Sequence, residues 1–235
     1  MKITMITGPT AGIGKSLAYQ LAQRGENLLL IARREERLRS ISEDIQNKFN
    51  VKVLYLVADL TAQEAPNSIY QYCKEHDLDV STLVLNAGYQ INTRLHEASI
   101  EDEESCLRVL GLSVIMQTKL HLTDFVKRGG GKIMVVSSIA AFAPTSKEFA
   151  VLYGPVKTFM NRFVEGINGA YNKDNIFATS VCPGFTTTEF HEMSGTQERM
   201  DKVPSFMKMT ADDVAKEGIA GCLLYTSPSP RDLRK

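Results

Sequence analysis

The stretch Thr7-Gly8-Pro9-Thr10-Ala11-Gly12-Ile13-Gly14-Lys15 connects a short apolar run, Ile3–Thr7, to an amphipathic segment over residues 13–24. Its three glycines permit a tight turn and let the backbone approach a bound group closely. The start of the following helix offers free N–H groups and the positive end of the helix dipole, which together favour phosphate. The stretch therefore predicts a strand–turn–helix unit that binds a dinucleotide, in preference to a purely structural glycine-rich turn.

Five further apolar runs follow the first, and longer amphipathic segments separate them. The runs are nearly continuous in apolar residues, as in strands buried on both faces, and they cover Asn27–Ala32, Val51–Ala58, Thr82–Asn86, Lys132–Ser137 and Phe177–Cys182. The segments that we predict to be helices cover residues 34–49, 63–76, 100–127, 150–172 and Ala211–Leu224. This alternation predicts an α/β fold with a single doubly wound parallel sheet of the Rossmann type, helices on both faces, and a ligand crevice at the carboxyl ends of the strands.

The composition argues against several other classes of protein. The 235 residues include 27 Lys plus Arg and 27 Asp plus Glu, so the formal net charge is zero. The composition therefore lacks the positive charge that is typical of proteins that bind nucleic acid or an anionic membrane. No apolar run approaches the ~20 residues of a membrane span, and the first strand begins too close to Met1 for a signal peptide. The four cysteines form no Cys-x-x-Cys motif and the four histidines lack metal-ligand spacing. We therefore expect reduced thiols in a cytoplasmic protein without a bound metal.

The residues that follow the second and third runs bear on which dinucleotide binds. The second run ends at Ala32-Arg33, where Ala32 cannot hold the adenosine ribose hydroxyls as an acidic residue would, whereas Arg33 can accommodate a 2′-phosphate. This pair favours NADP over NAD, although an arginine here can also simply open a charged helix. After the third run comes Asp59-Leu60-Thr61, where the Asp59 carboxylate can accept from an adenine amino group or cap the next helix.

Small and polar residues also follow the last three runs. Asn86-Ala87-Gly88 lets the backbone pass close to a cofactor, and the hydroxyl of Ser138 would face the crevice. Pro183-Gly184 ends the sixth strand, and the threonines that follow it can contact a polar ring substituent.

Tyr153 and Lys157 are four residues apart, so on a helix their side chains lie on one face, one turn apart. A neighbouring ammonium favours the ionised phenol, so we expect it to lower the pKa of Tyr153 and make the tyrosine a better proton donor near neutral pH. Such a pair suits general acid–base work on an oxygen atom. Taken alone, the spacing occurs mostly on solvated helix faces.

The chain resembles the short-chain dehydrogenase/reductase family, in its compact oxidoreductase branch, from about Lys2 to Ala220. The motifs that carry the resemblance are, in order, Thr7-Gly8-x-x-x-Gly12-x-Gly14, Asn86-Ala87-Gly88, Ser138, Tyr153-x-x-x-Lys157 and Pro183-Gly184. The resemblance implies that NADPH delivers hydride to the carbonyl carbon of a ketone, aldehyde or 3-oxoacyl group. It implies catalytic roles for Tyr153 as proton donor, Ser138 as hydrogen-bond partner of the substrate oxygen, and Lys157 as ligand of the nicotinamide ribose. It also implies cofactor contacts from Gly8, Thr10, Gly12, Ile13, Gly14, Arg33, Asp59, Leu60, Asn86, Ala87, Gly88, Tyr153, Lys157, Pro183, Gly184, Thr186 and Thr188.

Two features depart from the family pattern. Many members carry an Asn in the helix before the fifth strand, where it supports the lysine through a water-linked proton relay; here that position falls near Leu110 or Gly111, which cannot relay a proton. In addition, Pro155 lies between Tyr153 and Lys157. Proline is tolerated in a first helical turn but kinks an interior, and Thr145-x-x-Glu148 resembles a capping box that would start the helix earlier.

Two competing functions follow from these departures and from the glycine loop. A dinucleotide-binding sensor or partner protein with little catalytic activity would explain the missing Asn, whereas the intact Ser138, Tyr153 and Lys157 favour an NADP-dependent oxidoreductase. A P-loop nucleotide hydrolase does not fit the spacing of the loop.

Three further expectations concern substrate, assembly and the end of the chain. We expect residues Phe185–Met209, rich in Phe and Met, to form a mobile apolar lid over a small carbonyl or alcohol substrate. By analogy with relatives, which associate through their two long helices, we expect a homodimer or homotetramer. Residues 1–224 should form the single domain. The Pro- and Ser-rich residues 225–235 should form a disordered, non-native tail in place of the last edge strand, so that the sixth strand has an open edge.

Overall fold

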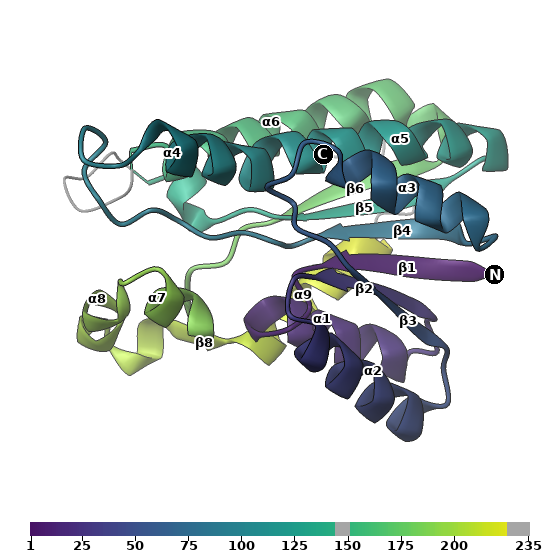
Figure 1. The fold of residues 1–235 in the computed structure, drawn as a ribbon, viewed down its shortest axis with the longest axis horizontal. Coiled ribbons are helices and arrows are strands. Elements are labelled where there is room, and N and C mark those ends of the chain that lie inside the picture. Colours follow the sequence, from purple (N-terminus) through teal and green to yellow (C-terminus); the bar gives the residue numbers. More distant parts are fainter. Residues whose placement is uncertain (144–150, 225–235) are drawn as a thin grey trace, which may run out of the picture.

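A six-stranded parallel sheet forms the centre of the protein. The computed structural model describes residues 1–143 and 151–224 (Figure 1). All six predicted strands are present, in the order β3-β2-β1-β4-β5-β6. They are β1 (Lys2–Thr7), β2 (Leu28–Ala32), β3 (Val53–Val57), β4 (Asp79–Leu85), β5 (Gly131–Val136) and β6 (Ile176–Val181).

The start of β4 lies earlier than the apolar run suggested. The strand begins at Asp79 because Asp79 and Val80 pair with Lys2 and Ile3 of β1, beyond an irregularity in the register between Ile3 and Thr4. Backbone pairing with the central strand thus extends β4 through a polar residue. A pattern of apolar residues indicates which side chains are buried, so it does not predict pairing that involves only the backbone.

Helices cover both faces of the sheet, as Figure 1 shows. On one face α3 (Ala65–Glu75), α5 (Ser113–Arg128) and α6 (Tyr153–Tyr171) pack over side chains such as Leu83 and Ile133. On the other face α1 (Gly12–Gln23), α2 (Glu35–Phe49) and α9 (Ala211–Leu224) pack over side chains such as Leu30 and Met134. The predicted doubly wound fold is therefore confirmed, with an apolar core on each side of the sheet.

The long helix predicted over residues 100–127 is wrong in one respect, because it is interrupted. α4 (Ile100–Leu107) leads into a π-helical turn, η1 (Arg108–Leu112), before α5 begins. The Ser113 hydroxyl donates to the Val109 carbonyl at 2.8 Å beside this turn. Such π turns widen a helix by one residue and are frequent at functional sites, and this one places Leu110 in the candidate site described below.

The last described helix matches its prediction. α9 begins at Ala211, and the Thr210 hydroxyl caps it by accepting from the backbone N–H of Asp213 at 3.1 Å. Val214 and Ile219 are buried against the sheet. Within the described residues β6 is an edge strand of the sheet. The tail predicted for residues 225–235 lies outside the described residues, as does the capping box predicted at Thr145-x-x-Glu148.

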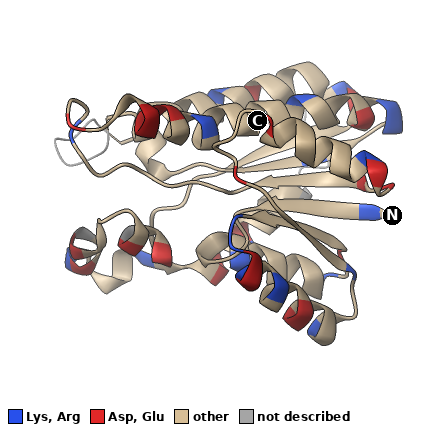
Figure 2. Cartoon of the chain, in the orientation of Figure 1, with Lys and Arg blue, Asp and Glu red and all other residues tan. Residues whose placement is uncertain are grey.

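Charged side chains of both signs are interspersed along the outer helices (Figure 2). Many of them pair within one helix, as Lys48 does with Asp44 and Arg108 with Glu104. None of the helices in the described ranges combines the length and apolar character needed to cross a bilayer.

Candidate active site

The start of α6 places Tyr153 and Lys157 on one helical face. α6 begins at Tyr153, and its first backbone bond joins the Val156 N–H to the Leu152 carbonyl at 2.9 Å. Pro155 therefore lies in the first turn, where its missing N–H would have had no helical partner and its fixed φ suits the helix. Of the two boundaries that the sequence left open, the structure has the later one.

Ser138, Tyr153 and Lys157 come together at the carboxyl end of β5. The Ser138 side chain is hydrogen-bonded to the Tyr153 hydroxyl, and its oxygen also accepts from the Ala140 N–H at 3.1 Å. The Lys157 ammonium nitrogen lies 5.5 Å from the centre of the Tyr153 ring and donates to the Val136 carbonyl at 2.8 Å. The three residues predicted to be catalytic thus form one cluster, with Lys157 buried beneath it.

Burial dominates the ionisation of this cluster. Loss of water raises the pKa of Tyr153 to about 12, although the hydrogen bond from Ser138 opposes that change. Loss of water also lowers the pKa of Lys157 to about 8. The prediction that Lys157 lowers the pKa of Tyr153 is therefore wrong for the protein without its cofactor. The ammonium is directed to the Val136 carbonyl, and it does not offset the cost of burying a phenolate.

The glycine loop forms a close-fitting cradle between β1 and α1. Gly8 and Gly12 have φ values of +69° and +51°, in the left-handed region that side chains disfavour. A Cβ on Gly14 would lie 2.2 Å from the Gly8 carbonyl oxygen. Within the described residues no side chain caps the N-terminus of α1, so its first N–H groups remain available to an anion. This arrangement fits the pyrophosphate of a dinucleotide.

Asn86 has a structural task that the sequence did not reveal. Its amide nitrogen donates to the carbonyls of Thr7 and Gly8, both at 3.0 Å, and so ties the end of β4 to the glycine loop. The Thr7 hydroxyl in turn accepts from the N–H groups of Asn86 and Ala87. The side-chain amide of Asn86 is thereby committed to the loop, and the cofactor contact predicted for Asn86 and Ala87 stays a prediction.

The predicted adenosine-binding residues lie at the ends of β2 and β3. A guanidinium nitrogen of the exposed Arg33 side chain lies 3.9 Å from a carboxylate oxygen of Asp59. Asp59 accepts from the N–H and hydroxyl of Thr61, at 3.0 and 2.9 Å, and so caps a turn. Helix α3 begins later, at Ala65, so the alternative that Asp59 caps this helix is wrong. Leu60 is buried in the core.

Sequence reasoning missed a second group of charged residues beside this region. Arg34 donates to the Thr10 hydroxyl at 2.8 Å, and Arg34 and Arg37 both lie against Glu189 at the start of α7 (Glu189–Met193). Glu189 is more than 150 residues from the arginines in sequence. The Arg33-Arg34 pair was the only available signal, and it did not indicate an acidic partner.

Pro183-Gly184 and the two predicted threonines connect the sheet to the lid. The Pro183 carbonyl accepts from the Ile139 N–H at 2.9 Å, which holds the ends of β5 and β6 together. Buried Thr186 donates to the Gly184 carbonyl at 3.1 Å, and Thr188 caps α7 by accepting from the Phe190 N–H at 3.2 Å. These hydroxyls are engaged within the protein, so their predicted contacts with a carboxamide stay predictions.

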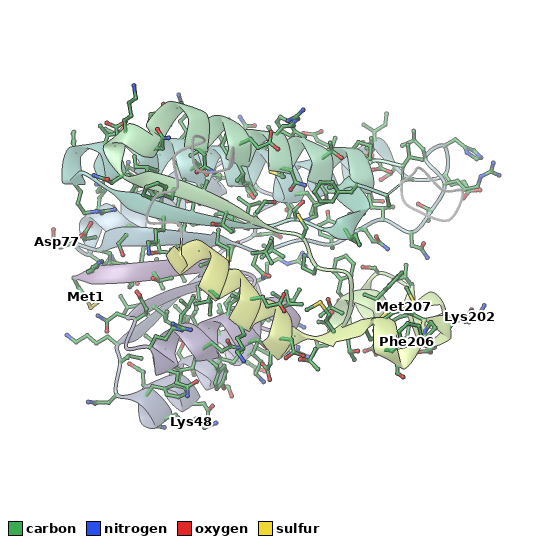
Figure 3. All side chains as sticks on the ribbon, turned by 180° about the vertical axis from the view of Figure 1, so that it is seen from behind. Met1, Lys48, Asp77, Lys202, Phe206 and Met207 are labelled. Carbon is green, nitrogen blue, oxygen red and sulfur yellow. The ribbon has the colours of Figure 1, made fainter. Side chains whose placement is uncertain are left out.

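The predicted lid is a folded unit. β7 (Phe185–Thr187) pairs in parallel with β8 (Lys208–Thr210), and α7, α8 (Gln197–Lys202) and a short 3-10 turn lie between them. Phe206 is 86% exposed and Met193 is 72% exposed. Figure 3 places Phe206 and Met207 at the end of the molecule away from Met1. Apolar side chains thus lie open on the unit that adjoins the candidate site, where the Phe190 and Tyr153 rings are 6.1 Å apart.

Leu110 occupies the region where the family pattern has an Asn. It is only 2% exposed and packs with Cys106 and Val156. Its side chain lies 2.8 Å from the point where a Cβ on Gly88 would sit, and that same point is 4.0 Å from the Lys157 ammonium nitrogen. A side chain on Gly88 would therefore collide with Leu110, and the Gly88 position lies between Leu110 and the region of the buried lysine.

Leu110→Asn should raise turnover and leave cofactor affinity little changed. An amide at this position restores the polar group that the family pattern has there, at the cost of about 1–3 kcal/mol of stability if the amide stays partly unsatisfied. Leu110→Ala is the control, because it removes the apolar group without adding an acceptor. Steady-state kinetics beside thermal melting would check this. A folded Asn variant with unchanged kcat would show that the missing Asn does not limit the reaction.

Comparison with known proteins agrees with this geometry. A family profile described as short chain dehydrogenase matches residues 2–199. The very-long-chain 3-oxoacyl-CoA reductase of Rattus norvegicus is 29% identical over 228 residues, which cover 94% of this chain and 69% of that protein. A 3-oxoacyl-(acyl-carrier-protein) reductase of Aquifex aeolicus is 27% identical, with 80% and 75% covered. A solved short-chain dehydrogenase from Sphingobium yanoikuyae in complex with NADPH is 26% identical, with a TM-score of 0.86 and 94% and 84% covered.

The matches cover a larger share of this chain than of the reductases that it resembles. The chain spans between 59% and 69% of the length of the very-long-chain 3-oxoacyl-CoA reductases that it matches. The family profile nevertheless covers most of this chain, including the glycine loop and the cluster of Ser138, Tyr153 and Lys157. The chain therefore belongs to the short-chain dehydrogenase family and has the Rossmann-type fold of its oxidoreductases.

Proposed function

We propose that the protein is an NADP-dependent oxidoreductase that reduces a carbonyl group, with Tyr153 as the general acid. The observation that carries the proposal is the convergence of the Ser138, Tyr153 and Lys157 side chains beside the glycine cradle. Consumption of NADPH, followed by its absorbance across a panel of ketones, aldehydes and 3-oxoacyl thioesters, tests it. Absence of turnover with every carbonyl by a protein that binds NADPH would contradict it.

The chain's own residues divide the work of such a reaction. NADPH, when bound, supplies the hydride. The N–H groups at the start of α1 bind the pyrophosphate, and Gly8, Gly12 and Gly14 let it approach the backbone. Ser138 holds the substrate oxygen by a hydrogen bond, and Tyr153 donates its hydroxyl proton to that oxygen. Lys157 holds the ribose and keeps a positive charge near the phenolate that Tyr153 becomes.

A 3-oxoacyl thioester is the substrate class that we favour. Relatives at 27–29% identity are named 3-oxoacyl reductases, and the exposed apolar side chains of the lid suit an acyl chain. The competing function, a dinucleotide-binding sensor, is favoured by the apolar Leu110 in the region where the family pattern has an Asn. Binding of NADPH without measurable reduction of any carbonyl would support the sensor.

NADPH should raise the melting temperature more than NADH at equal concentration, because the tighter ligand shifts the folding equilibrium further. The physical reason is the pair of arginines that follows Ala32 at the end of β2, and solved relatives hold NADPH and a 5-hydroxy-NADP. The double variant Ala32→Gly, Arg33→Asp should reverse the order, because a carboxylate accepts from ribose hydroxyls and repels a phosphate. Differential scanning fluorimetry would measure both. Equal responses in the unaltered protein would contradict the NADP assignment.

We also propose that the protein is a cytoplasmic homodimer or homotetramer that associates through α5 and α6. Exposed apolar side chains on these helices and the preceding turn, namely Leu112, Met116 and Phe159, would be buried by such contact. Light scattering in solution tests the assembly, and a monomer at micromolar concentration would contradict it.

A further inference from the structure

We propose that Glu189, the first residue of α7, determines cofactor specificity by competing with the cofactor's 2′-phosphate for Arg34. The proposal rests on the NADP dependence proposed above. Glu189 would act as a built-in anion, so that the protein binds 2′-phosphorylated ligands less tightly than its arginines alone would allow.

The first support is the set of contacts around the carboxylate. One guanidinium nitrogen of Arg37 donates to both Glu189 oxygens, at 2.8 and 3.1 Å. Arg34 lies 3.6 Å from one of the same oxygens, and another of its nitrogens donates to the Thr10 hydroxyl at 2.8 Å. Arg34 therefore lies between the glycine loop and the lid, and Arg37 holds the carboxylate in place beside it.

The second support is packing between the lid and the glycine loop. Thr188, which caps α7, lies against Gly12, where an added Cβ would come within 3.0 Å of its side chain. The start of α7 is thus held against the loop by a neutral contact next to the ionic one. Glu189 is consequently fixed beside Arg34, whose other guanidinium nitrogen contacts Thr10 of the glycine loop.

Electrostatics then sets the direction of the effect. A phosphomonoester carries about −1.5 to −2 charges at pH 7, and the arginines lower the pKa of Glu189 so that it is ionised there. A phosphate that reaches Arg34 must displace the carboxylate or lie beside it, and either outcome weakens binding. By reciprocity, the phosphate loosens α7 by the same factor. A ligand without a 2′-phosphate has no such conflict.

The test compares two probes that differ only in the 2′-phosphate, adenosine 2′,5′-bisphosphate and adenosine 5′-monophosphate, by calorimetry on the full chain. Glu189→Gln should tighten the bisphosphate roughly two- to five-fold, the range expected for a partly exposed ion pair, and leave the monophosphate unchanged. In an Arg34→Gln background, Glu189→Gln should give no gain, because the shared guanidinium is gone. Amide hydrogen exchange in α7 should quicken when the bisphosphate binds to the unaltered protein.

Glu192→Gln is the matched control, because Glu192 lies on the same helix and makes no ion pair among the described residues. It should change neither affinity. Equal effects of the Glu189 and Glu192 variants, or a gain that persists without Arg34, would overturn the proposal while leaving NADP dependence intact. Equal affinity of the Glu189→Gln variant for both probes would overturn the proposal and NADP dependence together.

Discussion

Replacing Tyr153 by Phe should lower kcat by roughly 10²–10⁴-fold, the usual contribution of a positioned general acid. The change removes only the hydroxyl oxygen, which is hydrogen-bonded to Ser138. The ring would remain between Leu110, Val156 and the lid, so the fold and most cofactor contacts should persist. Affinity for NADPH, measured by its fluorescence, should therefore change little. Single-turnover kinetics would place the loss in the chemical step.

Tyr72→Phe is the control for this experiment. Tyr72 is a partly buried tyrosine of α3, stacked on His76, on an element that contributes no residue to the catalytic cluster. Its variant should keep full activity. Turnover retained by the Tyr153 variant would remove Tyr153 from the mechanism and would favour either water or Ser138 as the proton donor.

The sequence was sufficient for most of the sheet because the strands are short and largely apolar, and the central strands β1 and β2 are buried on both faces. Runs such as Ile3–Thr7 and Lys132–Ser137 differ from the observed strands by at most one residue at each end. Ser138, Tyr153 and Lys157 also lie close together, and their catalytic roles stay predictions. Their spacing depends on where strands end, and an apolar pattern reports strand ends well.

Features that depend on distant contacts could not be read in this way. The π turn at Arg108–Leu112 contains Leu110, which packs against Gly88, more than 20 residues earlier. The Glu189 carboxylate pairs with Arg37, from which it is more than 150 residues distant in sequence. The pKa of Tyr153 was predicted to fall from the charge four residues away, but burial, a property of the folded environment, raises it.

Replacing Lys157 by Met should abolish most activity and also change how stability depends on pH. Lysine in an unfolded chain has a pKa near 10.5, whereas burial lowers the pKa of Lys157 in the folded protein to about 8. Between these values the unfolded chain binds more protons than the folded one, so this group makes stability rise with pH. Below pH 8 the protonated lysine is held at the full cost of burying its charge.

The pH dependence can be isolated by subtraction. Unfolding free energies from urea titrations, taken as unaltered protein minus the Lys157→Met variant, should increase by on the order of 2–3 kcal/mol from pH 8 to pH 10. Buried Cys73 and Cys222, whose pKa values burial raises to about 11, lower stability as the pH rises above 9, but they do so equally in both proteins and cancel. Burial also raises the pKa of Cys106, and the Lys157 charge opposes that rise, so Cys106→Ala is introduced into both proteins to remove its contribution. Replacing exposed Lys119 by Met should give no such difference. A difference that stays flat across this range would mean that the Lys157 ammonium is as well solvated in the fold as in the unfolded chain. The buried hydrogen bond to the Val136 carbonyl would then stabilise the ammonium as well as water does.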